Sequence, residues 1–268
     1  MIVYETTKEM FVKDVIENKI ANRIEQLYRL RIGNNVNPRE KTAWKNSMQY
    51  MNNILNDSSI PNNSGIAIEF KIPYTSKRVD LIITGKDNNR RNVAIIVELK
   101  QWTKAEIVEG KDGIVKTILG GALTEVAHPS YQAWAYASHI ENFNENIQNG
   151  NVKLYPCAYL HNYEETAPPT ILSEKYKEHI KKAPLFTAED VYKLKEFISS
   201  HIKYGDNKET LDMIENGKIK PSKSLQDCIA RMVKQNAEFV LLDNQKVVYE
   251  TAMDMARKSN EDNKKRCL

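Results

Sequence analysis

Residues 65–100, GIAIEFKIPYTSKRVDLIITGKDNNRRNVAIIVELK, decide the fold because they contain three β-branched runs of strand length in succession. The runs are residues 65–73, 78–85 and 92–100, and the polar segments YTSK and KDNNRR separate them. Runs of this kind bounded by polar turn residues are typical of consecutive strands. The stretch therefore predicts a three-stranded meander.

Helical patterns precede the meander. Apolar side chains at helical spacing predict one amphipathic helix over residues 8–31, ended by Gly33. Pro38 is well placed in the first turn of a second helix, which carries Trp44, Met48, Met51 and Leu55 on one face. Two helices are therefore expected before the sheet.

The pattern changes again after the meander. Residues 105–121 predict two short strands that turn at residues 111–113, with Gly120 and Gly121 as a flexible exit. A buried helix over residues 128–143 and a strand over residues 152–160 follow. We therefore expect an α/β fold with a mixed, mostly antiparallel sheet flanked by helices.

Strand signals nearly vanish after residue 167. Thr187 and Asp190 form a start resembling a capping box for a helix over residues 188–202. Further helices are expected at about residues 207–217, 222–236 and 240–258. The predicted organisation is a core domain of residues 1–167 and a helical annex of residues 168–268.

The composition is that of a folded globular chain, because 41 % of the 268 residues are hydrophobic and 28 % are charged. No apolar run approaches the roughly 20 residues of a membrane span, and no signal-peptide pattern begins the chain, so a cytoplasmic location without membrane contact is expected. Three widely spaced cysteines indicate neither a disulfide framework nor a structural zinc site. The net charge of +4 is compatible with nucleic-acid binding but does not decide it.

Charged residues occur within the second and third apolar runs of the predicted meander, which we expect to be neighbouring strands. Asp80 lies in the apolar run VDLII, while Glu98 and Lys100 are two residues apart and so face the same side of the next strand. A buried carboxylate loses several kcal/mol of solvation unless it is paired, and two facing carboxylates repel. Mg²⁺, with Mn²⁺ as an alternative, is the natural partner of Asp80, Glu98 and the carbonyl of Leu99.

Such a site has the parts needed for phosphodiester hydrolysis. A bound metal lowers the pKa of water and offsets charge on a phosphate, and Lys100 can orient that water or stabilise the transition state. Gln132 and Tyr136 are four residues apart and share a helix face, where an amide and a phenol can bind a phosphate or position the lysine.

These residues together resemble the PD-(D/E)xK, or restriction-endonuclease-like, nuclease superfamily, and the Gln132 and Tyr136 pair is similar to the Gln-x-x-x-Tyr motif of its RecB-like branch. The resemblance implies that Asp80 and Glu98 are metal ligands and that Lys100 is the catalytic lysine. It further implies that Glu40, on the helix before the sheet, is an acid aimed at the metal. Val79 stands where the family name has Pro.

A closer resemblance covers nearly the whole chain. The stretches EKTAWKNSM, IPYTSKRVDLIITG, VELKQW and FVLLDNQKVVYE, together with residues 109–137, resemble the N-terminal nuclease-like region of bacterial proteins carrying a helicase-type ATPase motor like that of group-three Schlafen proteins. The sequence has no GxxxxGK[ST] phosphate loop, so the resemblance implies an excised module whose partner is that ATPase. A homodimer is a further expectation from the superfamily.

Several alternatives stay open at this point. Lys77, Arg78, Lys104 and His128 are assigned to a nucleic-acid backbone, although solvated turn residues account for the basic side chains equally well and a histidine at a helix start more commonly caps or packs. Glu98 and Lys100 could be a surface ion pair, and Gln132 and Tyr136 could be satisfied core groups. The predicted function is a metal-dependent endonuclease with DNA favoured over RNA; the alternative is a catalytically silent nucleic-acid-binding or regulatory module.

Overall fold

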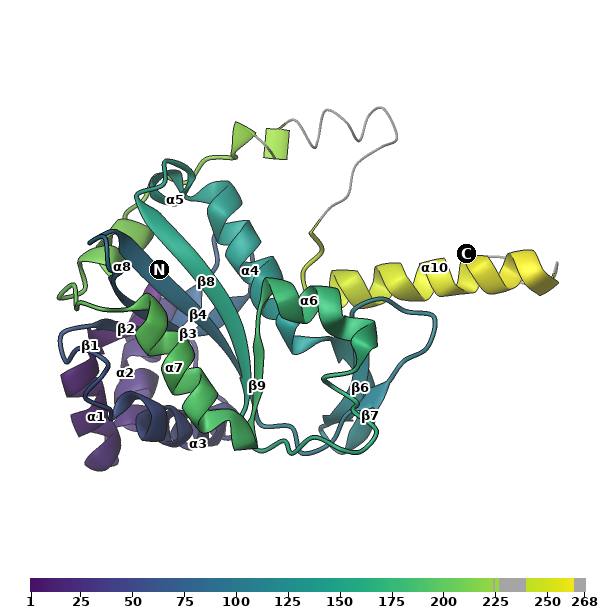
Figure 1. Ribbon diagram of the computed structural model, residues 1–268, viewed down its shortest axis with the longest axis horizontal. Coiled ribbons are helices and arrows are strands. Elements are labelled where there is room, and N and C mark those ends of the chain that lie inside the picture. The colour runs from purple at the N-terminus through teal and green to yellow at the C-terminus, as the bar shows by residue number, and fades with distance from the viewer. Residues whose placement is uncertain (224, 227–239, 263–268) are drawn as a thin grey trace.

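The computed structural model describes residues 1–223, 225–226 and 240–262 and shows an α/β fold built on a mixed six-stranded sheet flanked by helices (Figure 1). The strand order is β1-β2-β3-β4-β8-β9. Neighbours from β1 to β4 are antiparallel, whereas β8 and β9 continue the sheet in parallel. The strands are β1 (Ile2–Thr7), β2 (Gly65–Lys71), β3 (Arg78–Lys86), β4 (Asn92–Lys100), β8 (Val152–Leu160) and β9 (Leu185–Thr187).

The predicted meander is confirmed as β2, β3 and β4. Its register pairs Ile68 with Leu81 and Leu81 with Val97, so these three side chains lie in one row across the sheet. β4 pairs in parallel with β8 along its whole length. The chain between these two strands crosses over the sheet, so β4 and β8 lie side by side in its centre. Strands buried on both faces read as continuous apolar runs, which is why residues 93–97 contain no polar side chain.

Helices cover both faces of this sheet. One face packs against α1 (Lys8–Ile16), α2 (Ile20–Ile32), α3 (Pro38–Leu55) and α7 (Val191–His201) through a core that contains Met48, Leu81 and Ile198. The other face packs against α4 (Pro129–Phe143), α5 (Glu145–Gln148) and α8 (Glu209–Glu215) through a core that contains Ile96, Ala135 and Leu211.

The N-terminal segment differs from its prediction in two ways. Residues 8–31 do not form one helix, because Asn18 adopts a left-handed conformation with φ 54° and separates α1 from α2. Asn tolerates this conformation better than most residues, which permits a tight turn there. The strand β1 is absent from the prediction, and it extends the sheet by pairing with β2 from Ile2↔Phe70 to Thr7↔Gly65.

A second, three-stranded sheet projects after β4, with the order β5-β6-β7. It comprises β5 (Glu106–Ile107), β6 (Ile114–Leu119) and β7 (Ala122–Ala127). The two short strands predicted to turn at residues 111–113 are confirmed as the antiparallel pair β5 and β6. The third strand, β7, was not predicted: Gly120 and Gly121, expected as a flexible exit, form the tight turn of the β6–β7 hairpin with φ 59° and 88°. Two positive φ values suit a two-residue hairpin turn, and glycine adopts them without steric cost.

Residues after 167 share the core of residues 1–167. β9 pairs with β8, and α7 and α8 contribute Leu194, Ile198 and Leu211 to the two faces of the main sheet. The capping box at Thr187 and Asp190 is present and starts the turn Ala188–Asp190 that leads into α7. The expected helix at residues 222–236 falls largely outside the described residues, and the last expected helix is α10 (Asn244–Asp262).

Within the described ranges, none of the helices combines the length and the apolar character that a membrane crossing requires.

Candidate functional site

The polar site begins where the central strands separate. The last pair of the β3–β4 ladder at this end is Leu81 with Val97, and continuing the register places Asp80 opposite Glu98. On the other side of β3, Glu69 has φ 58° and interrupts the β2–β3 ladder between its pairs at Ile68 and Phe70. Three carboxylates on adjacent strands therefore lie at one level of the sheet, where the β3–β4 ladder ends.

A cleft of about 390 Å³ lies over this opening and collects most of the residues predicted for the site. Its lining includes Glu40, Lys77, Arg78, Asp80, Glu98, Leu99, Lys100, Gln132 and Tyr136. Sequence positions that span nearly one hundred residues thus meet in one cavity. The lining also includes Trp44, Glu69, Gln101 and Asp243, to which the sequence analysis assigned no role in the site.

Asp80 is held in position by β4, the strand that carries Glu98 and Lys100. Its Oδ2 accepts a hydrogen bond of 2.8 Å from the backbone N–H of Leu99. Burial raises the pKa of Asp80, while the charge of Lys100 and the hydrogen bond from Leu99 act in the opposite direction. The carboxylate thus depends on nearby positive charge to remain ionised.

Glu98 and Lys100 form an ion pair inside the cleft rather than on the surface. Lys100 Nζ lies 2.7 Å from Glu98 Oε1, and the Glu98 side chain is only 4 % exposed. Burial, followed by repulsion from Asp80, raises the pKa of Glu98 to about 8. Burial alone lowers the pKa of Lys100, but Glu98 and Asp80 outweigh it and raise that pKa above its ordinary value, so the amine stays protonated.

The pair of carboxylates fits a small divalent cation. Within the described part of the chain, Glu98 Oε2 is buried and has no hydrogen-bond partner. Two crowded acids with an unsatisfied oxygen are the situation that a hard cation relieves. The described residues hold no cluster of three or more His, Cys, Asp or Glu side chains arranged for a metal. A cation here would take Asp80 and Glu98, with a backbone carbonyl and water, a donor set that suits Mg²⁺.

Gln132 and Tyr136 lie on α4 and face the same cleft. Gln132 Nε2 donates a hydrogen bond of 3.0 Å to the Tyr136 hydroxyl, which donates one of 2.7 Å to Asp243 Oδ2. Burial, and then the charges of Glu98 and Asp243, raise the pKa of Tyr136. The phenol therefore acts as a neutral hydrogen-bond donor at this wall of the cleft.

Arg78 forms ion pairs with two acids of the cleft, Glu40 and Glu69. Its guanidinium donates to Glu69, lies 2.5 Å from Glu40 Oε1 and donates a 2.8 Å hydrogen bond to the Tyr28 hydroxyl. Trp44 Nε1 donates a further hydrogen bond of 2.8 Å to Glu69, whose pKa rises to about 7 through burial and then repulsion from Asp80. Glu40 therefore lines the cleft, as the resemblance implies, but its carboxylate is paired with Arg78.

The four residues assigned to a nucleic-acid backbone have different environments. Lys77 lies in the cleft and pairs with Asp243 at 2.6 Å, and Arg78 is held by the acids just described. Lys104 is exposed in the loop after β4, outside the cleft. His128 is fully buried: it accepts from Ser130 N–H at 3.2 Å and lies 2.9 Å from the Ile171 carbonyl, so it caps α4 and presents no group to a ligand.

Among the lining residues that the sequence did not indicate, Asp243 comes from the most distant part of the chain. It lies in the stretch FVLLDNQKVVYE, immediately before α10, and reaches the cleft from far along the chain. An acid between an apolar run and a helix is ordinarily explained as a helix start, so its position gave no signal of a role in the cleft.

The chain matches no protein-family model, no curated protein and no solved structure.

Proposed function

We propose that this chain is a metal-dependent nuclease that hydrolyses phosphodiester bonds of nucleic acid, with DNA preferred over RNA. The observation that carries the proposal is the placement of Asp80 opposite Glu98, with Lys100 paired to Glu98, in a cleft at the open end of two central strands. Two neighbouring acids can hold a metal ion, and an amine beside them can stabilise charge on the phosphate, as metal-assisted phosphate hydrolysis requires.

The arrangement of elements supports the same proposal. A helix, α3, precedes the antiparallel strands β2, β3 and β4, and α4 connects them to the parallel strand β8. This order is similar to that of the restriction-endonuclease-like core, and the gathering of Asp80, Glu98 and Lys100 in one cleft supports the PD-(D/E)xK resemblance. The resemblance also supports a helicase-type ATPase as the partner of this domain.

Six residues of the cleft have a role in the proposed reaction. Asp80, Glu98 and the Leu99 carbonyl would hold Mg²⁺ or Mn²⁺. When bound, the cation lowers the pKa of water and offsets negative charge at the scissile phosphate. Lys100, protonated beside Glu98, supplies a donor and a positive charge for the phosphate in the transition state. Gln132 and Tyr136 supply uncharged hydrogen-bond donors from the opposite wall.

The charge of the cleft makes activity depend on metal. Five acidic and three cationic side chains line it, and the raised pKa values of Glu69, Asp80 and Glu98 show that burial disfavours ionisation of these acids; a bound cation would let the acids ionise and would attract the phosphate backbone. The carboxylates are Glu40, Glu69, Asp80, Glu98 and Asp243, and the cations are Lys77, Arg78 and Lys100. We therefore expect both productive binding and cleavage to require a divalent ion.

The test is incubation of the protein with end-labelled single-stranded DNA, double-stranded DNA and single-stranded RNA, each with Mg²⁺, Mn²⁺ or EDTA. Metal-dependent cleavage of DNA, lost in EDTA, is the expected result. Absence of cleavage on every substrate, together with absence of Mg²⁺ and Mn²⁺ binding by calorimetry, overturns the proposal. Metal-dependent DNA binding without cleavage would instead favour a catalytically silent binding module.

A further inference from the structure

A C-terminal segment enters the candidate active site. Residues 240–243, which we call the strap, precede α10, and the carboxylate of Asp243 at its end lines the cleft beside Glu98 and Tyr136. Asp243 Oδ2 accepts a hydrogen bond of 2.7 Å from the Tyr136 hydroxyl and lies 2.6 Å from Lys77 Nζ. Its side chain is only 14 % exposed, so it fills the space between these two donors.

The strap is docked along α4 by backbone and apolar contacts. The Tyr131 hydroxyl donates to the Leu241 carbonyl at 2.9 Å and accepts from the Leu241 N–H at 3.2 Å. Leu242 is buried in the apolar cluster between α4 and the sheet, and Val240 packs against the same cluster. These contacts set the position of the strap independently of the charges in the cleft.

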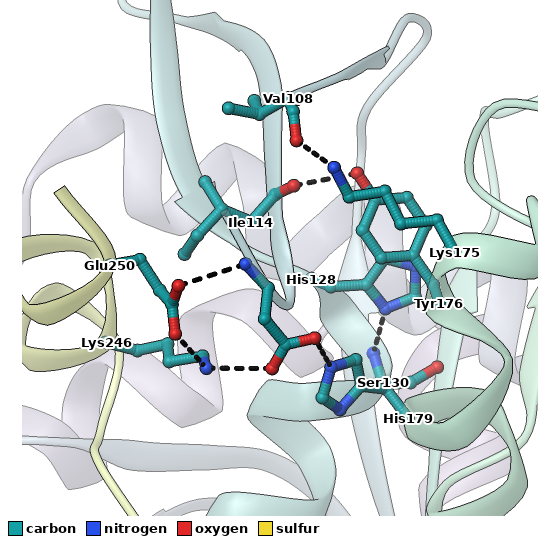
Figure 2. Close-up of polar contacts among 10 residues, drawn as sticks. Val108, Ile114, His128, Ser130, Lys175, Tyr176, His179, Lys246 and Glu250 are labelled. Atoms are coloured by element: carbon teal, nitrogen blue, oxygen red, sulfur yellow. Dashed lines mark hydrogen bonds and ion pairs between the residues drawn. The ribbon is translucent and has the colours of Figure 1, made fainter. Parts of the chain in front are cut away.

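A second attachment lies on α10 itself, away from the cleft. Lys246 Nζ lies 2.8 Å from Glu250 and 3.0 Å from Asp112, in the loop before β6 (Figure 2). Asp112 also lies 2.9 Å from His179 of α6 (Lys177–Lys182), and its backbone N–H donates to Glu250 at 3.0 Å. Lys246 and Glu250 are both largely buried, so this cluster anchors the first turns of α10 to the smaller sheet.

The carboxylate of Asp243 lies where a phosphate could bind, but it satisfies that position incompletely. In the described part of the chain its Oδ1 is buried and has no hydrogen-bond partner. It also adds negative charge to a cleft that already holds Asp80 and Glu98. Lys77, Tyr136 and Gln132 are donors of the kind that bind a phosphate oxygen.

We infer that the strap is autoinhibitory: Asp243 occupies an anion position formed by Lys77 and Tyr136, and a backbone phosphate of the nucleic acid takes that position when the strap and α10 move away. The inference rests on the proposed nuclease function, because it assigns the displacing anion to the substrate of that site. Since the closed form cannot bind substrate there, the apparent affinity equals the intrinsic affinity multiplied by the fraction of molecules that are open.

The experiment compares the parent chain with Asp243→Asn and Lys246→Met, and with Asp212→Asn as a control that removes an exposed acid on α8. Binding of a fluorescent single-stranded DNA is measured by anisotropy with Ca²⁺, and cleavage is measured with Mg²⁺. Asp243→Asn is expected to bind about tenfold tighter and to cleave faster than the parent, because it removes the competing charge. Lys246→Met, whose side chain lies outside the cleft, is expected to act in the same direction.

The outcomes separate this inference from the proposed function. If the parent cleaves DNA and Asp243→Asn binds and cleaves equally well or worse, the strap inference is wrong while the nuclease proposal stands. If Asp243→Asn gains affinity but no variant cleaves, the strap inference is supported and the catalytic proposal fails. If no variant binds DNA, the anion position does not serve a nucleic acid, and the inference falls together with the proposed function.

Discussion

The backbone N–H of Leu99 donates a hydrogen bond of 2.8 Å to the carboxylate of Asp80, and the two residues are 19 positions apart on neighbouring strands. Leu99 lies between Glu98 and Lys100, so this bond holds Asp80 against the segment that carries the other two charged groups. The relative positions of the three side chains are thus set by the backbone of the sheet, which is more rigid than a loop.

Replacing Asp80 should weaken metal binding without unfolding the protein. Asp80→Asn keeps an oxygen that can accept from Leu99 but removes one of two charges available to a cation. In calorimetry the parent should bind Mn²⁺, and Asp80→Asn should bind it at least about tenfold more weakly. Mn²⁺ at about 100 times the Kd of the parent should stabilise the parent by about 3 kcal/mol in thermal unfolding and Asp80→Asn by no more than about 1.4 kcal/mol.

The matched control is Glu106→Gln, which removes an exposed acid from β5. It should bind Mn²⁺ as the parent does. Equal Mn²⁺ affinity in Asp80→Asn and the parent would show that Asp80 is not a ligand.

Lys100 is expected to matter for the chemical step more than for binding. Lys100→Met removes the positive charge that lies 2.7 Å from Glu98 and should lower kcat by about 100-fold to 1,000-fold, the range for loss of one transition-state donor. Affinity for DNA in Ca²⁺ should change far less. Lys45→Met, at an exposed position of α3, serves as the control. A loss of DNA affinity that matches the loss of kcat/KM would mean that Lys100 only binds substrate.

Local sequence pattern was sufficient for the centre of the fold. β2, β3 and β4 are continuous apolar runs joined by short polar linkers, so both their existence and their antiparallel order could be predicted. Asp80, Glu98 and Lys100 could be brought together for the same reason, since neighbouring strands fix the register of their charged ends. The Gln132 and Tyr136 pair needed only the periodicity of a helix.

Features that depend on distant contacts could not be predicted in this way. β9 has only three residues, Leu185–Thr187, too few for an alternation, and becomes a strand because β8 offers it a free edge. The hydrogen bond between Tyr136 and Asp243 spans 107 positions and requires the docking of the strap and α10. The break at Asn18 is a single backbone conformation that leaves the apolar pattern of both helices unchanged.

Arg78 should stabilise the fold rather than contact nucleic acid. It pairs with Glu40 and Glu69, and the Glu69 side chain is only 8 % exposed. Arg78→Met leaves these acids without their cation and should lower the free energy of unfolding by about 2 kcal/mol, less than for a fully buried pair because the guanidinium is partly exposed. Arg29→Met breaks an exposed pair with Glu25 on α2 and should cost under about 0.5 kcal/mol in the same urea titration. If the two variants lose equal stability, the buried pairs of Arg78 contribute nothing beyond a surface bridge.

His128 should make the fold sensitive to mild acid. Burial lowers its pKa from 6.5 to about 4, although the hydrogen bond to the Ile171 carbonyl acts in the opposite direction. The ring stacks on Tyr176, with 4.5 Å between the ring centroids. The unfolded chain takes up this proton as the pH falls below about 6.5, whereas the folded chain resists protonation until about pH 4, so stability is lost on acidification. From about pH 7 to about pH 5 the loss from His128 alone should be about 2 kcal/mol.

His128→Asn tests this assignment because Asn keeps an acceptor for the α4 cap and does not titrate. Urea unfolding of the variant should show a pH dependence smaller by about 2 kcal/mol between about pH 7 and about pH 5, even though its stability at neutral pH is lower. His201→Asn, on α7, should keep most of the pH dependence of the parent. An unchanged pH dependence in His128→Asn would mean that the acid sensitivity of the fold arises from other groups.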